Sequence, residues 1–274
     1  MRRALLVLLS FILTMGAAAA IERVDLELVL AIDISGSVDA DEGRLQRDGY
    51  INALNDPEVL KAIRSGIEGK IAIAYFEWSG PETRRLLLDW TIIEDEATAK
   101  AAAAKLATFP IRSAMSTSIS GAIDYAMPMY GRAFEGTRRV LDISGDGPNN
   151  AGQLIDISRE NAIARGITIN GVPIINNRPN VTGFPQLPDL DLYFQHCVIG
   201  GPGAFIVVAE GFESFAEAIR RKMIIEIADL TSPHARWRIP EATFRLASSA
   251  YPPGCDIGER QSREFWQRRY QSPY

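Results

Sequence analysis

The sequence predicts an α/β domain built on a mainly parallel central sheet with helices on both faces. Apolar, β-branched stretches alternate with stretches of helical pattern from residue 24 to residue 230, and this alternation is typical of parallel sheets. The strand stretches are apolar almost throughout, as expected when helices cover both faces. A chain of 274 residues, 47% of them hydrophobic, has room for one such domain with additional segments.

The first half of the domain contains three expected strands and three expected helices. The strands lie at residues 24–32, 70–78 and 86–92, and the helices lie at residues 40–54, 57–65 and 94–107. Asp39 and Glu42 have the spacing of a capping pair at the start of the first helix, and Pro57 starts the second helix. Only a short turn around Gly80 separates the second and third strands, so the third is expected to be an antiparallel edge strand.

The second half continues the alternation. Strands are expected at residues 138–144, 167–175 and 204–209, and helices at residues 118–130, 151–165, 190–196 and 212–230. Gly166 ends the helix before the fifth strand, and a loop rich in Pro and Asn is expected at residues 176–189. The periodic pattern fades after residue 230. We therefore expect one domain at residues 21–230 and a C-terminal tail, residues 231–274, packed on it.

The first twenty residues have the three parts of a secretory signal peptide. Arg2 and Arg3 precede a mostly apolar run at residues 4–15, and small residues ending in Ala18-x-Ala20 follow. The alternative is an uncleaved membrane anchor, but the run is short for a span of about 20 residues. We expect a periplasmic or secreted protein with no transmembrane segment after cleavage of residues 1–20.

Composition excludes several classes of function. With 29 basic and 34 acidic residues the net charge is −5, which argues against sequence-independent binding of nucleic acid. Two His and two Cys are too few for a His-rich or four-Cys metal centre. In the oxidising compartment that export implies, Cys197 and Cys255 are expected to form a disulfide bond, with two free thiols as the alternative.

Polar side chains follow the strands expected near the middle of the sheet. Asp33, Ser35 and Ser37 come directly after the first strand, and Asp146 comes after the fourth. Thr117 lies just before a helix. Because the carboxyl ends of parallel strands meet at one edge, these segments are expected to converge there. Two carboxylates and several hydroxyls form a set of hard oxygen ligands suited to Mg²⁺ or Mn²⁺.

These residues resemble the metal-ion-dependent adhesion site of a von Willebrand factor A-type domain. The family motif is Asp-x-Ser-x-Ser after the first strand, a Thr in a second loop and an Asp in a third, and the matching residues here are Asp33, Ser35, Ser37, Thr117 and Asp146. The resemblance covers about residues 24–230 and implies a Rossmann-like fold. It also implies that the Ser pair and the Thr bind the metal directly and that the Asp residues bind it partly through water.

The segments AIDISGSVDADE, DISGDGPNN, GITINGVPI and CVIGGPGAF further resemble a bacterial family of exported A-type domains without an established activity. Two positions depart from the common pattern. Gly145 stands where many relatives have Thr, and Ser116 stands where Gly is frequent, so Ser116 or Ser118 could take the place of Thr117. Taken singly, each ligand is explained equally well as a helix cap or a turn residue, and only the combination favours a metal site.

Other polar residues are expected to have structural roles. Asp142 lies inside the fourth strand, too far along it to share a metal with Asp146, and Asn170 is its candidate partner. Glu77, at the end of the second strand, is expected to be exposed to solvent. The alternative is that its side chain faces the expected metal site at the edge of the sheet. The two histidines, His196 and His234, are expected at the surface or in structural contacts. The Arg and aromatic residues of the tail are expected to pack on the acidic domain, or else to contact a partner or the cell envelope.

The resemblance implies an exported binding module, not an enzyme. Its divalent metal would capture an Asp or Glu side chain of a protein partner. The alternative is a metal-dependent hydrolase or phosphatase, because an Asp after the first strand together with Mg²⁺ also describes phosphatases. Those enzymes need a second carboxylate where this chain has Ser35, and neither a Gly-x-Ser-x-Gly motif nor an evident general base is present. A structural domain with a vestigial site is the third alternative.

We expect the mature chain to begin at Ile21, because Ala18-x-Ala20 follows a short apolar core. Protein recovered from the exported fraction should give this single N-terminus on sequencing. An intact Met1 in the membrane fraction would support the membrane anchor instead.

Overall fold

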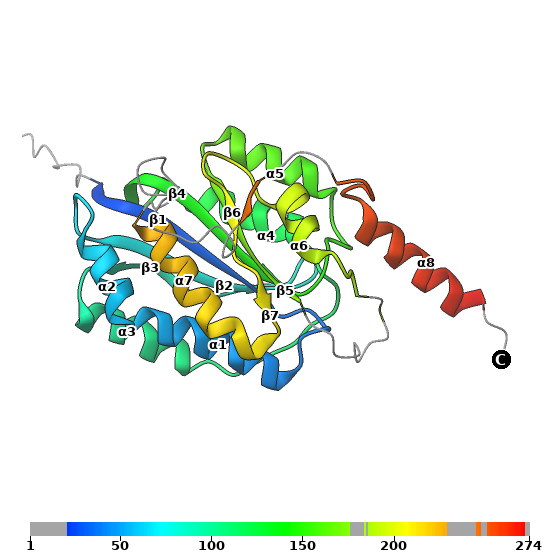
Figure 1. Ribbon diagram of the computed structural model, residues 1–274, viewed down its shortest axis with the longest axis horizontal. Helices are drawn as coiled ribbons and strands as arrows, with labels where there is room; N and C mark the ends of the chain where they lie inside the picture. Colours follow the sequence, from blue (N-terminus) through cyan, green and yellow to red (C-terminus); the bar gives the residue numbers. More distant parts are fainter. Residues whose placement is uncertain (1–20, 176–183, 185, 229–244, 248–250, 272–274) are drawn as a thin grey trace, which may run out of the picture.

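The computed structural model describes residues 21–175, 184, 186–228, 245–247 and 251–271 (Figure 1). The expected signal peptide, most of the expected loop at residues 176–189, and His234 lie outside these ranges. Within them, no helix is both long enough and apolar enough to cross a membrane.

An eight-stranded sheet forms the centre of the domain, in the order β3-β2-β1-β4-β5-β6-β8, with β7 paired to β5. The strands are β1 (Glu22–Asp33), β2 (Ile71–Trp78), β3 (Arg84–Ile93), β4 (Phe134–Gly145), β5 (Thr168–Ile175), β6 (Phe205–Ile206), β7 (Ala209–Glu210) and β8 (Arg245–Leu246). Strand β1 is parallel to both β2 and β4, and β3 is the expected antiparallel edge strand. Strand β8, which the sequence does not predict, is antiparallel to β6 at the other edge.

Helices cover both faces of the sheet, as expected (Figure 1). The helices are α1 (Ala40–Leu54), α2 (Pro57–Arg64), α3 (Glu96–Ala107), α4 (Ile119–Ala126), α5 (Ile155–Ala164), α6 (Leu190–Tyr193), α7 (Phe215–Ile227) and α8 (Ile257–Gln271). Helices α1, α2, α3 and α7 lie on one face, and α4, α5 and α6 on the other. Each face of the sheet has its own hydrophobic core, and alternate residues of β1 point into one or the other. Leu28 and Leu30 pack in the core beneath α1, α2, α3 and α7, and Val29 and Ala31 pack in the other.

Three of the expected elements change type or divide along their length. The helix expected at residues 118–130 ends as a 3₁₀ turn at Met127–Met129, because Pro128 has no amide hydrogen to continue the α-helix. The short helix after residue 190 continues as a π-helix at Phe194–Val198. The strand expected at residues 204–209 divides into β6 and β7, which pair with different parts of β5.

The C-terminal tail contains a 15-residue helix, α8, that the sequence analysis did not predict. Its sequence lacks the continuous apolar stripe from which an amphipathic helix is recognised. Ion pairs between residues four apart, Arg260 with Asp256 at 3.2 Å and Arg268 with Glu264 at 3.4 Å, support the helix instead. The predicted Cys197–Cys255 disulfide is present and attaches the segment before α8 to the π-helix.

Two buried carboxylates have other partners than expected. Asp142 lies 2.7 Å from the ammonium of Lys222 on α7, which also lies 3.0 Å from Glu226. Asn170, its expected partner, instead donates to Glu226 at 2.6 Å. The expectation of a solvated Glu77 is wrong, because Glu77 is 2% exposed and forms ion pairs with Arg47 and Arg85. A sequence does not show which distant cation reaches a strand, so neither pairing could be foreseen.

The Asp142 cluster should make stability depend on pH. It contains two carboxylates and one ammonium, and burial above all raises the pKa of Asp142 to about 7, although Lys222 opposes the rise. A carboxyl group whose pKa is higher in the folded chain binds a proton preferentially there, so stability falls as pH rises through 7. We expect Asp142 to contribute a decrease of about 1 kcal/mol in the free energy of unfolding between pH 6 and pH 8.

Urea titrations across this range measure the change. Asp33 and Asp146 also have raised pKa values and contribute in both proteins, so the contribution of Asp142 is the difference between wild type and Asp142→Asn, and the variant should show a decrease smaller by about 1 kcal/mol. An equal pH dependence in wild type and in the variant would assign the effect to other groups.

Candidate functional site

The first segment of the site is a tight turn at the carboxyl end of β1. The Oδ1 atom of Asp33 accepts a hydrogen bond of 2.7 Å from the amide of Ser35, which is the local geometry that favours Asp in turns. The amide of Ile34 donates to the carbonyl of Trp78 at 2.8 Å, and the amide of Ala114 donates to the carbonyl of Ile34 at 2.8 Å. The turn is therefore fixed on both sides by neighbouring segments.

Residues of the first and third segments meet directly. The hydroxyl of Ser37 donates to Oδ1 of Asp146 at 2.6 Å and lies 3.1 Å from the hydroxyl of Ser35. Ser37 and Asp146 are 109 residues apart in the chain, and the parallel pairing of β1 with β4 brings them together. The structure thus joins Asp33, Ser35, Ser37 and Asp146 at one sheet edge.

One oxygen of Asp33 has no hydrogen bond within the part of the chain that the structure describes. The whole residue is buried, and its Oδ2 atom has no hydrogen bond among the described residues. A Cβ atom at Gly145 would lie 3.1 Å from this oxygen, so the bare glycine allows β4 to approach Asp33 closely. A buried anionic oxygen without a hydrogen-bond donor is costly, and a bound cation would satisfy it. The oxygen atoms that meet at this edge of the sheet therefore fit a divalent metal.

The second segment presents Thr117, which is 5% exposed. Its amide donates to Oδ1 of Asn150 at 2.9 Å, and its carbonyl accepts from the amide of Asn150 at 2.8 Å. This reciprocal pair attaches the Thr117 loop to the loop after β4. Ser118 is the residue that caps α4, because its hydroxyl accepts from the amide of Gly121 at 3.2 Å. The cap role considered for Thr117 therefore belongs to Ser118.

The two carboxylates affect each other. Burial, and after it the charge of Asp146, raise the pKa of Asp33 well above its usual value of 3.8. Burial also raises the pKa of Asp146 to about 6, although the hydrogen bond from Ser37 opposes the rise. A divalent cation between them would favour both ionised forms.

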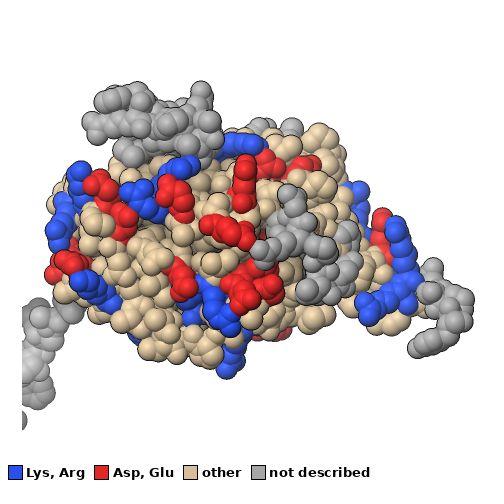
Figure 2. Space-filling view, turned by 60° about the horizontal axis from the view of Figure 1, so that its bottom comes forward, with Lys and Arg blue, Asp and Glu red and all other residues tan. Residues whose placement is uncertain are grey.

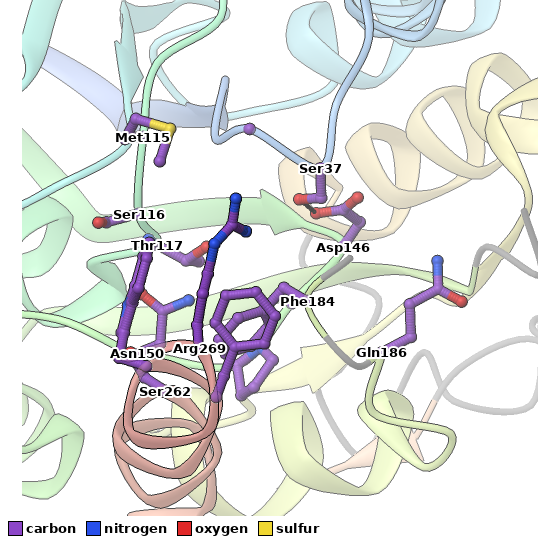
Figure 3. Close-up of a pocket in the computed structure, with 15 residues that line it drawn as sticks. Ser37, Met115, Ser116, Thr117, Asp146, Asn150, Phe184, Gln186, Ser262 and Arg269 are labelled. Atoms are coloured by element: carbon purple, nitrogen blue, oxygen red, sulfur yellow. Dashed lines mark hydrogen bonds between the residues drawn. The ribbon is translucent and has the colours of Figure 1, made fainter. Parts of the chain in front are cut away.

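A cavity of about 420 Å³ opens above these residues (Figure 3). Ser37, Thr117 and Asp146 line it, whereas Asp33 and Ser35 are buried and do not line it. Its opposite wall comes from the described part of the tail, which contributes Ser262, Phe265, Trp266 and Arg269 of α8. The sequence analysis gave a partner contact as the alternative role of the Arg and aromatic residues of the tail, but did not place them at this site. It also missed Asn150 and Asn149, whose Oδ1 atom accepts from the amide of Ser120 at 2.9 Å. The only signal for the two amides was their place in the loop directly after Asp146.

Residues 23–231 match a family described as proteins of unknown function (DUF1194). The chain belongs to this family. No curated protein matches it. The DUF1194 match covers β1 to α7 and therefore includes all five expected metal ligands, but not α8.

Several solved structures share the fold of this DUF1194 chain. Proximal thread matrix protein 1 from the mussel byssus, with zinc in its metal-ion-dependent adhesion motif, has a TM-score of 0.52 at 11% identity and covers 76% of the chain. The von Willebrand factor type A protein of Catenulispora acidiphila has a TM-score of 0.50 at 13% identity and covers 75%. The pilus adhesin SpaC of Lactobacillus rhamnosus GG has a TM-score of 0.54 at 12% identity and covers 77%.

The chain spans only 47%, 43% and 30% of these three proteins. At such identities the likeness shows the fold, which is that of a von Willebrand factor A-type domain.

Ser116, which stands where Gly is frequent in the resembling family, is expected to lower the stability of the fold. Ser116 has a φ of 67°, and among the described residues no other non-glycine residue has a positive φ. This left-handed conformation costs a non-glycine residue about 1 kcal/mol or more. We expect Ser116→Gly to raise the free energy of unfolding by up to about 1 kcal/mol, since part of the gain is offset by the greater flexibility of unfolded glycine.

Chemical denaturation measures the difference. Ser113→Gly is the control, because Ser113 lies in the same loop without a positive φ and should be destabilised. A loss of stability in both variants would contradict the prediction.

Proposed function

We propose that this protein is an exported binding module that uses a divalent cation, Mg²⁺ or Mn²⁺, to capture an Asp or Glu side chain of a partner protein. The observation that supports it best is the meeting of hard oxygen atoms from separate loops. The hydroxyl of Ser37 touches both Ser35 and Asp146, and the partnerless oxygen of Asp33 lies in the same buried place.

The buried charges of the molecule support a cation at this site. Two buried carboxylates elsewhere lie beside basic side chains: Asp142 beside Lys222, and Glu77 beside Arg47. Asp33 and Asp146 have no ion pair with a Lys or Arg among the described residues. Buried charges need compensation, so these two carboxylates are matched to a cation that the chain does not supply.

The residues would hold the metal in distinct ways. Asp33 and Asp146 would balance its charge, and Ser35, Ser37 and Thr117 would offer neutral oxygens. Within the described ranges no three His, Cys, Asp or Glu side chains come together to hold a metal, so these hydroxyls would be essential. A metal held by two carboxylates keeps a coordination position for an external carboxylate.

The comparisons agree with this function without establishing it for this chain. One similar structure carries zinc in its adhesion motif, and another is a pilus adhesin. The proposed partner is a protein, because the net charge of the chain is −5, whereas nucleic acid binding needs a basic surface. On the face that Figure 2 shows, Lys and Arg are interspersed with Asp and Glu. The signal peptide pattern and the disulfide support a periplasmic or secreted location.

Replacing Asp33 tests the site. Asp33→Ala removes one of two carboxylates at the sheet edge, and three hydroxyls cannot neutralise a divalent ion. Wild type should be stabilised by Mg²⁺ or Mn²⁺, by about 2.7 kcal/mol at a hundred times the Kd, whereas Asp33→Ala should not. Asp33→Asn should also fail, although it preserves the turn hydrogen bond to Ser35.

Melting temperatures are measured across a metal titration of chelator-stripped protein, and they show whether the metal stabilises wild type and not the Asp33 variants. Asp48→Ala, an exposed change on α1, is the matched control and should respond like wild type. An equal metal-induced shift in Asp33→Ala and wild type would exclude this constellation as the metal site.

A further inference from the structure

Helix α8 forms a wall of the cavity above the candidate metal site. Phe265, Trp266 and Arg269 line the side opposite Ser37 and Asp146. Figure 3 shows the side chain of Arg269 extending from α8 into the cavity, toward the edge of the sheet. A partner residue that reaches Ser37 and Asp146 must therefore pass alongside α8.

The beginning of α8 is firmly attached to the domain. The disulfide fixes Cys255, whose carbonyl accepts from the hydroxyl of Tyr193 at 3.3 Å. Asn149, in the loop that follows Asp146, donates to Glu259 at 2.7 Å. A Cβ atom at Gly258 would lie 2.1 Å from the carbonyl of Asn149, so α8 touches this loop backbone to backbone. The first turn of α8 is thus fixed to the loop that follows Asp146, and the helix continues from it along the cavity.

The charges around the cavity favour an acidic ligand. Arg269 and Asp146 are the charged residues among those that line it, and Arg269 has no ion pair or hydrogen bond within the described ranges. A divalent metal at Asp33 and Asp146 would add positive charge to the floor of the cavity, and the guanidinium of Arg269 would add more at its wall. A carboxylate would be attracted by both, and a guanidinium binds carboxylates with favourable geometry.

The same cavity offers apolar surface. Met115 is 65% exposed and Trp266 is 40% exposed, and both line it. Phe265 packs on Phe184 with ring centroids 5.5 Å apart, which completes an apolar side. Exposed apolar side chains next to polar groups mark binding sites. This surface therefore suits an apolar side chain next to the carboxylate.

We propose that α8 is the second half of the recognition site and selects an acidic residue with an apolar neighbour. Arg269 binds the carboxylate that the metal captures, while Met115, Phe265 and Trp266 hold the neighbouring side chain. A cavity of about 420 Å³ has the size of a ligand pocket. The partner therefore inserts a short projecting segment, a loop or a chain end, and not a flat face. This inference rests on the proposed function.

The probe is an array of synthetic pentapeptides with Asp or Glu at the centre and every residue type at the two flanking positions. The full mature chain is applied in Mn²⁺ or in chelator, and fluorescence anisotropy gives the affinity of the selected peptides. We expect binding only in Mn²⁺, with apolar residues preferred beside the acid. Arg269→Ala should weaken binding at least about tenfold, without changing the Mn²⁺ affinity measured by calorimetry.

Two variants of α8 serve as matched controls. Arg263→Ala removes an exposed cation of α8 that does not line the cavity, and it should leave binding unchanged. Trp266→Ala should abolish the apolar preference, whereas Tyr270→Ala, at a residue that is 83% exposed and outside the cavity lining, should retain it.

The possible results separate the two proposals. Metal-dependent binding of acidic peptides without an apolar preference, and equally strong in Arg269→Ala, would overturn the role of α8 and leave the proposed function standing. If the mature chain binds Mn²⁺ but no acidic peptide of the array, the capture of a partner carboxylate fails, and the role of α8 fails with it.

Discussion

A buried carboxylate must be matched by positive charge, and this constraint explains much of the molecule. Asp142 inside β4 is matched by Lys222 of α7, and Glu77 at the end of β2 by Arg47 of α1. These pairs connect the sheet to the helices on one of its faces. At the carboxyl edge the same requirement is not met from within the chain, because Asp33 and Asp146 lie together without a described basic partner.

The parallel sheet creates that exception. Strand β1 lies between β2 and β4, and Ile32 and Ser144 are the last residues that pair β1 with β4, so Asp33 and Asp146 come just beyond that pair. Hydrogen bonds to neighbouring loops then fix the site. The amide of Ser35 donates to Asp33, and the amide of Thr117 donates to the side chain of Asn150. The geometry is therefore set by the backbone and by neutral side chains, and under the proposed function a bound cation would supply the charge that balances the two carboxylates.

Sequence reasoning succeeds where local pattern determines structure. Alternating apolar and helical stretches predict the order and the main pairing of the elements, and the Asp39–Glu42 capping box is present at α1. The polar residues of the first and third loops, Ser35, Ser37 and Asp146, lie together as expected, since strand ends in a parallel sheet share an edge. The cations that pair with Asp142 and Glu77 could not be predicted, because long-range packing selects them. Helix α8 has too few apolar residues to show a periodic stripe, so nothing in its pattern distinguishes it from an extended tail.

The placement of α8 also bears on how the protein can be handled and displayed. Strand β1 begins at Glu22, at the opposite end of the sheet from the cavity, and α8 lies on the cavity side (Figure 1). A support or fusion partner joined before β1 leaves the cavity facing outward. A bulky tag joined directly after α8 would stand beside Arg269 and compete for the same space. Immobilisation through the amino-terminal side is therefore the orientation in which an array of this protein would present its sites to a partner in solution.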